Sequence, residues 1–108
     1  MKDNLVYLEH IIECINKIKK YSDNLSKKEF IDNEVIQDAI IRNIEIIGEA
    51  SKNLSKDFKQ TYPEIPWKEI TGMRDKLIHH YIGVDIDVVW KTIEVDIPIL
   101  EKLLQKIK

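Results

Sequence analysis

A short segment of the chain, residues 73–81, concentrates side chains that act as acids, bases and cations. It holds two of the three histidines, His79 and His80, together with Arg74, Asp75 and Tyr81. Imidazole changes its charge near neutral pH, so a histidine held in place by a neighbour can donate or accept a proton. The segment therefore predicts an acid–base group close to a permanent positive charge.

The spacing within this segment predicts which of these side chains share a face of a helix. Asp75 and His79 are four residues apart, so the carboxylate can accept a hydrogen bond from the imidazole and favour its protonated form. Arg74 and Tyr81, seven residues apart, also share a face. Arg74 and His79 are five residues apart, about 140° around a straight helix. They would meet at one ligand only if the helix frays at its end, or if a twofold partner presents the matching helix.

The same residue types argue against a metal centre or a cofactor. Adjacent histidines point apart on a helix, so His79 and His80 are poor joint ligands of one ion. The chain also lacks a His-Glu-x-x-His zinc helix and a glycine-rich phosphate loop. We therefore expect no metal requirement and no cofactor.

Apolar residues recur every three or four positions through most of the chain, which predicts amphipathic helices. Only three glycines and three prolines are present, too few for the turns of an all-β fold. We expect long helices near residues 2–21, from Asp32 or Asn33 to about Leu54, from Pro66 to near residues 81–83, and from Asp85 or Asp87 through Ile107. The predicted fold class is all-α, an up-and-down helical bundle of four main helices plus short helical turns, forming a single domain over residues 1–108.

Local signals mark where these helices begin and bend. Ser26 and Glu29 have the spacing of a capping box, and Ser55 can cap a short helix. Gly48 lies inside the second long helix, where glycine costs about 1 kcal/mol relative to alanine, so we expect another stretch of backbone to pack closely against it. Pro98 should kink the last helix, because proline removes a helical hydrogen bond.

Length, charge and cysteine content narrow the possible functions. The chain has 108 residues and carries 19 acidic and 17 basic side chains, for a net charge of −2. Proteins that coat nucleic acid usually carry a basic excess, so any contact with nucleic acid is expected to be local. The single cysteine, Cys14, excludes an internal disulfide framework and fits a reducing cytoplasm. No apolar run approaches the roughly 20 residues of a membrane span, and Asp3 does not suit a signal peptide, so we expect a cytoplasmic protein with no membrane partner.

The pattern of Arg74-Asp75, three residues, His79, one residue and Tyr81 resembles the Arg-polar-x3-His signature of HEPN domains, in the form found in HepT-like toxins. The surroundings match the layout of that family as well. They are Ile46-Ile47-Gly48-Glu49-Ala50, Ile65-Pro66-Trp67, Gly72-Met73-Arg74, and Val89-Trp90 ahead of Ile97-Pro98. The resemblance covers nearly the whole chain, and the combination of the motif with these flanks makes it specific.

The resemblance implies an all-helical homodimer with a composite cleft, acting as a metal-independent endoribonuclease toxin. Its partner would be a small nucleotidyltransferase antitoxin of the MNT type. His79 would be the base for the 2′-hydroxyl and the acid for the departing 5′-oxygen, Arg74 would oppose the charge on the phosphorane, and Asp75 would orient His79. Tyr81 would be the hydroxyl to which the antitoxin adds AMP.

Each of these residues also has an alternative role. His80 competes with His79 as the base, although only His79 follows Asp75 by one helical turn. By spacing alone, Asp75 and His79 form a surface pair worth a few tenths of a kcal/mol. Arg74 can instead form an ion pair within the bundle, with Glu49 or Glu69.

The main alternative to an enzyme is a non-catalytic HEPN module that binds RNA or nucleotide, or that scaffolds a nucleotidyltransferase. A purely structural dimer would be favoured if Arg74 were buried in an ion pair far from any groove. Glu49 is expected either as a structural residue or in the wall of the cleft.

Three further expectations concern packing. Trp67 and Trp90 are predicted to anchor the core, and His10 is predicted to be solvated on the polar face of the first helix. The regular apolar seams of the first and last helices suggest that a second copy of the chain packs against them, which predicts a dimer.

Overall fold

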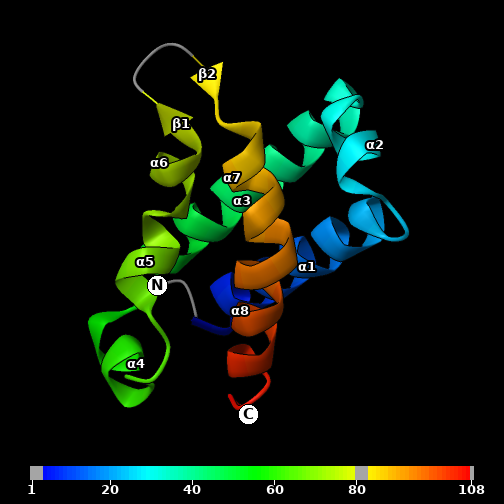
Figure 1. The fold of residues 1–108 in the computed structure, drawn as a ribbon. Helices are drawn as coiled ribbons and strands as arrows, with labels where there is room; N and C mark the ends of the chain where they lie inside the picture. The colour runs from blue at the N-terminus through cyan, green and yellow to red at the C-terminus, as the bar shows by residue number, and fades with distance from the viewer. Residues whose placement is uncertain (1–3, 80–82, 108) are drawn as a thin grey trace.

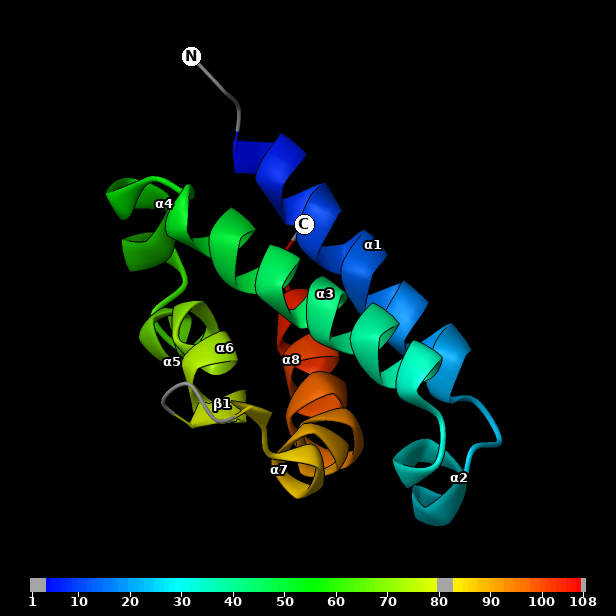
Figure 2. The same ribbon diagram turned by 90° about the horizontal axis from the view of Figure 1, so that it is seen from above.

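Two 19-residue helices, α1 (Asn4–Ser22) and α3 (Glu34–Lys52), run side by side and form one layer of the fold (Figure 1, Figure 2). The computed structural model describes residues 4–79 and 83–107. The other helical elements are α2 (Lys27–Ile31), α4 (Lys56–Thr61), α5 (Trp67–Thr71), α6 (Met73–Leu77), α7 (Ile86–Lys91), the π-helical turn η1 (Thr92–Asp96) and α8 (Ile97–Leu104). Two-residue strands, β1 (Ile78–His79) and β2 (Gly83–Val84), pair antiparallel between α6 and α7. The predicted all-α bundle is confirmed.

The core is made by the apolar stripes that the sequence pattern predicts. Fully buried isoleucines of α1 and α3 carry much of it: Ile11, Ile15, Ile18, Ile40, Ile44 and Ile47. Val89, Ile97 and Leu100 of the last helices join the same cluster. The seams of the first and last helices are therefore filled within one chain, apart from exposed positions such as Leu5 and Ile12. Their regularity does not by itself require a second copy.

The helix starts follow the predicted capping residues. Ser26 and Glu29 form a full capping box, and the side chain of Asn33 accepts a hydrogen bond of 3.0 Å from the Ile36 amide. The hydroxyl of Ser55 accepts from the Phe58 amide at 3.1 Å, and Asp85 caps α7. The position of each helix start depends on nearby residues alone, because each capping side chain satisfies backbone amides within one turn of itself.

Both tryptophans anchor the core as predicted. Trp67 is buried, and its indole nitrogen donates to the carbonyls of Lys59 and Tyr62. Trp90 is buried against Phe30, with ring centroids 5.3 Å apart. Each ring thereby ties a short helix to the rest of the bundle.

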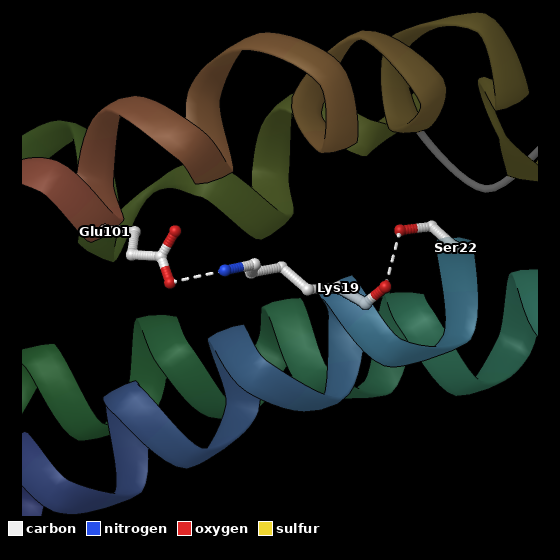
Figure 3. A network of polar contacts seen from close by, with 3 residues as sticks. All are labelled: Lys19, Ser22 and Glu101. Carbon is white, nitrogen blue, oxygen red and sulfur yellow. Dashed lines mark hydrogen bonds and ion pairs between the residues drawn. The ribbon is translucent and has the colours of Figure 1, made fainter. Parts of the chain in front are cut away.

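An ion pair on the surface links the first and last helices. Lys19 of α1 donates to Glu101 of α8 at 2.7 Å, beside the hydroxyl of Ser22, which donates to the Lys19 carbonyl (Figure 3). The lysine side chain is 53% exposed, so the pair is worth at most about 1 kcal/mol. Burial of the apolar seams, rather than this contact, holds α1 against α8.

Gly48 allows the close approach that its position in α3 predicts. A Cβ atom there would lie 3.1 Å from the carbonyl oxygen of Thr71 and 3.6 Å from that of Ile70. The end of α5 therefore packs directly on the backbone of α3 (Figure 2). This contact brings the segment that follows, α6, alongside α3.

The predicted third long helix, from Pro66 to near residues 81–83, is wrong in its second half. The helix breaks at Gly72, which ends α5, and it stops at Leu77. The carbonyl of Leu77 accepts from the amide of Asp85 at 2.8 Å, an acceptor that a continuing helix would need for itself. The apolar spacing continues across Gly72, so periodicity alone does not reveal the break.

The irregularity expected at Pro98 takes the form of a π-helical turn. The amide of Ile97 donates to the carbonyl of Thr92, five residues earlier, in place of the usual four. Pro98 lacks an amide hydrogen and would clash with a carbonyl in a tight α-turn. The wider turn before it lets α7, η1 and α8 continue as one column (Figure 1).

Candidate functional site

Arg74 lies at the start of α6, where that helix faces α3 (Figure 2). Its Nε donates a hydrogen bond of 2.9 Å to Oε2 of Glu45, and its Nη1 lies 3.6 Å from Oδ1 of Asp75. The hydrogen bond that Arg74 donates to Glu45, followed by the charge of that carboxylate, raises the pKa of Arg74 above the ordinary value. The guanidinium is therefore a permanent cation with a defined orientation.

Part of the Arg74 guanidinium remains available for a ligand. The group carries five N–H donors, and within residues 4–79 and 83–107 its ion-pair partners are Glu45 and Asp75. The side chain is 51% exposed. Nη2 takes part in neither ion pair, and the planar fork of a guanidinium is well suited to two oxygens of a phosphate.

Two grooves meet at Arg74. The first, of about 440 Å³ and named here the α1–α3 groove, is lined by Tyr7 and His10 of α1, by Arg74, and by the outer face of α3 from Arg42 to Asn53. The second has a volume of about 430 Å³ and is named the α3–α5 groove. Its wall includes Glu45, Glu49 and Lys52 of α3, together with Lys68, Thr71 and Asp75. Arg74, Glu45 and Glu49 border both.

This position bears on the alternatives for Arg74 and Glu49. Arg74 does form an ion pair, but with Glu45 and not with Glu49 or Glu69, and it is exposed in the wall of two grooves. The condition for a purely structural role, burial far from any groove, is not met. Glu49 lies in the wall of the same grooves, one helical turn after Glu45.

Asp75 is placed differently from the sequence expectation. It belongs to α6, whereas His79 belongs to strand β1, because the helix ends at Leu77. The expected relation of one helical turn between them is therefore wrong. The Asp75 carboxylate is 82% exposed and pairs with its neighbour Arg74.

The helix ends at Leu77, between Arg74 and His79, so the angle of about 140° expected for a straight helix does not apply to this pair. The backbone of His79 pairs with Gly83 in the short hairpin. The side chain of His79 lies outside the described part of the structure, as do His80 and Tyr81. Their roles remain predictions.

The sequence alone did not place Tyr7, His10 and Arg42 in one groove with Arg74. His10 is exposed, as predicted, but it borders the same groove as Arg74, with Tyr7 one turn before it and Arg42 across from it on α3. Glu45 was missed as well. Its signal was available in the spacing, since Glu45 and Glu49 are four residues apart and flank Gly48, where α5 packs.

A larger groove of about 580 Å³ lies between α1 and α8 and is mainly apolar, with Ile12, Leu104 and Ile107 in its wall. Among the described residues, no group of three or more histidine, cysteine, aspartate or glutamate side chains is placed to hold a metal ion. No helix in that part of the chain is both long and apolar enough to cross a membrane.

The fold and this site define a small helical bundle with an arginine presented between two surface grooves. The sequence matches the family described as "Ribonuclease HepT-like" over residues 11–107, so the chain belongs to the HepT-like ribonuclease family. Membership supports a ribonuclease.

Relatives that match nearly the whole chain are also named as ribonucleases. The protein of Thermococcus cleftensis named "Probable ribonuclease HepT" is 49% identical, covering 94% of this chain and 93% of that protein. A "Putative RNase" of Caldanaerobacter subterraneus is 45% identical, covering 99% and 96%. A Methanocaldococcus jannaschii protein named "Gamma-glutamylcyclotransferase and putative RNase" is 46% identical over 98% of this chain, which spans 48% of that relative. No solved structure shows significant similarity.

Proposed function

We propose that this chain is a metal-independent endoribonuclease that cleaves RNA with Arg74 and His79. The observation that carries the proposal is the setting of Arg74, half-exposed between two grooves and oriented by Glu45 through Nε, with Nη2 outside both of its ion pairs. The family resemblance and the names of the relatives support the substrate class.

The proposed reaction needs no group beyond those of the chain. His79 accepts the proton of a ribose 2′-hydroxyl while that oxygen attacks the adjacent phosphorus. The bond from phosphorus to the 5′-oxygen breaks, and a protonated imidazole supplies the proton to the departing oxygen. Arg74 opposes the negative charge that grows on the phosphorane oxygens. The products are a 2′,3′-cyclic phosphate and a free 5′-hydroxyl.

The two proton transfers are most simply assigned to two copies of His79 in a homodimer. A twofold axis beside Arg74 places one imidazole of each protomer, and one arginine of each, around a single cleft. In one chain, a single His79 would have to change protonation state within each turnover. Asp75 keeps its proposed role as the residue that orients His79, now from α6 and across the end of the helix.

We further propose that the chain acts in the cytoplasm as a toxin, neutralised by an MNT-type nucleotidyltransferase that adds AMP to Tyr81. Tyr81 follows His79 by two residues in the sequence. An AMP group there would bring bulk and a negative phosphate next to the cleft. Both would oppose the entry of an RNA phosphate.

The test is cleavage of a mixed, end-labelled RNA by the purified chain in EDTA. Wild type is compared with Arg74→Ala, His79→Ala and the control Lys76→Ala, an exposed residue of the same short helix as Arg74. Circular dichroism and sedimentation first establish that each variant is folded and has the same oligomeric state.

The proposal expects cutting by wild type and Lys76→Ala alone, leaving 2′,3′-cyclic phosphate ends. Loss of cutting in EDTA would contradict the metal-independent mechanism. Equal cutting by all variants would point to a contaminating nuclease. RNA binding without cutting by folded wild type would instead support the binding module.

A further inference from the structure

The two arginines of this chain border the same groove. Its 17 basic residues comprise 15 lysines and only two arginines, Arg42 and Arg74. These come from different helices, α3 and α6, yet both line the α1–α3 groove. Arginine differs from lysine in offering a planar fork that binds phosphate oxygens in pairs. The groove therefore holds both residues of the type best suited to a phosphate chain.

Arg42 stands one helical turn from the carboxylate that holds Arg74. Arg42 and Glu45 are three residues apart on α3, a spacing that puts their Cβ atoms about 5–6 Å apart. Glu45 is nevertheless hydrogen-bonded to Arg74. Arg42 is exposed, and within the described residues it has no carboxylate within ion-pair distance. It is thus a cation whose charge is not matched by a paired side chain.

The rest of the groove suits a nucleoside more than a simple ion. Ile46 and Ala50 contribute apolar surface from α3, and Tyr7 and His10 of α1 stand one turn apart on the opposite side. Tyr7 is half-buried and packs on the core, so its ring is held in place. Bases stack on fixed aromatic rings with little dependence on sequence.

Glu49 limits the length of nucleic acid that this groove can bind. With Glu45 it brings two carboxylates against the two arginines, so the groove as a whole is not strongly positive. An extended, nonspecific nucleic-acid track would need more basic charge. The charges suit a short contact with one nucleotide and its phosphate.

We infer that the α1–α3 groove is a subsite for the nucleotide next to the scissile phosphate, in which Arg42 binds the neighbouring phosphate and Tyr7 contacts the base. The inference rests on the proposed function, because Arg74 is taken to hold the scissile phosphate itself. It assigns a substrate-binding role to Arg42 and Tyr7, residues outside the Arg74–Tyr81 motif.

The first experiment measures binding without cutting. In the His79→Ala background, the Kd of a labelled, single-stranded oligoribonucleotide is measured between about 50 and 200 mM salt for the parent, Arg42→Gln and Tyr7→Leu. The control is Lys20→Gln, which removes the same charge from an exposed position of α1 outside this groove. Sedimentation of each variant reports its oligomeric state.

Arg42→Gln is expected to weaken binding about 10-fold, as loss of a charged hydrogen bond does, and to lower the slope of log K against log salt by about 0.7, the value for one phosphate of a single strand. Tyr7→Leu is expected to weaken binding with no change in this slope. Lys20→Gln should match the parent. Equal Kd and slope for Arg42→Gln and Lys20→Gln would overturn the inference. A change of oligomeric state in Arg42→Gln alone would also overturn it, because the groove would then be a contact between copies.

A second measurement separates this inference from the proposed function. With His79 restored, kcat/KM is compared for a longer oligonucleotide and for a dinucleoside monophosphate, which has only the scissile phosphate. The preference for the longer substrate should fall in Arg42→Gln and persist in Lys20→Gln. An active wild type whose preference is unaffected by Arg42→Gln contradicts the subsite alone. An inactive wild type contradicts the nuclease, and the binding data then decide on the groove independently.

Discussion

The Nε atom of Arg74 donates a 2.9 Å hydrogen bond to Oε2 of Glu45, across the contact between α6 and α3. Nε is the guanidinium donor nearest the side-chain stem, so this bond fixes the direction in which the two terminal nitrogens project. Glu45 touches no reacting atom in the proposed mechanism. It is a positioning residue that acts through Arg74.

Glu45→Gln tests this relationship. The amide oxygen can still accept from Nε but lacks the charge of a carboxylate, so Arg74 is held less firmly and we expect kcat to fall about 10-fold with a smaller change in KM. Stability should change by less than about 1 kcal/mol, because the pair is partly exposed. The measurement is steady-state RNA cleavage, with Asp38→Asn, an exposed carboxylate of the same helix outside both grooves, as the control. In an Arg74→Ala background, where cleavage is already lost, Glu45→Gln should cause no loss of RNA binding; a further loss of binding would refute the positioning role.

The contact between Gly48 and Thr71 predicts opposite effects of substitution at two glycines. Gly48→Val places atoms about where the Thr71 carbonyl already lies, 3.1 Å from a Cβ, and should lower the free energy of unfolding by about 1–3 kcal/mol. A Cβ at Gly72 would meet its nearest neighbour, the Lys68 carbonyl, at 3.5 Å, an ordinary contact. Gly72→Ala should therefore leave stability unchanged or raise it by about 0.5 kcal/mol. Urea unfolding measures both, and equal effects would contradict the close approach.

Burial of Cys14 predicts how stability responds to alkaline pH. Desolvation raises the pKa of this thiol above its ordinary 9.0, with Lys17 and Arg42 opposing the rise and Glu13 adding to it. Above about pH 9 the unfolded thiol loses its proton before the folded one, so folding binds a proton and stability falls as pH rises. Below that pH the buried thiol makes its full contribution to the stability of the fold.

The comparison with Cys14→Ala isolates this effect. At pH 7 the variant should be less stable by about 1 kcal/mol, from the lost packing. The difference between the two proteins in free energy of unfolding, measured by urea titration, should become smaller as the pH rises above 9. A difference that stays constant or widens with pH would show that the thiol is not buried in the folded protein.

Modification of Tyr81 is tested by mass. Coexpression with a cognate MNT-type nucleotidyltransferase should add AMP units to wild type and none to Tyr81→Phe, and the modified protein should lose RNA cleavage. Mutation of the nucleotidyltransferase active site is the control for the enzyme. Unmodified wild type from an active pair, or modification retained in Tyr81→Phe, would remove the proposed regulation.

Much of the fold follows from short-range patterns in the chain. Ser26, Asn33, Ser55 and Asp85 begin helices because each satisfies amides within its own first turn. The buried stripes follow because a residue's place around its helix depends on local spacing alone. The choice of Arg74 as a candidate also came from the sequence, through its motif.

The contacts between helices could not be predicted from these local patterns and are seen only in the packed structure. From the sequence, Glu49 or Glu69 was a possible ion-pair partner of Arg74, but α5 packs on Gly48 and Glu45 receives the bond. The same packing places Arg42 and Tyr7 in one groove with Arg74, although they are far apart in the chain. The helix end at Leu77 likewise depends on a hydrogen bond from Asp85, eight residues later. Periodicity reports which face of a helix is buried, whereas the neighbour it meets depends on how helices from distant parts of the chain are oriented.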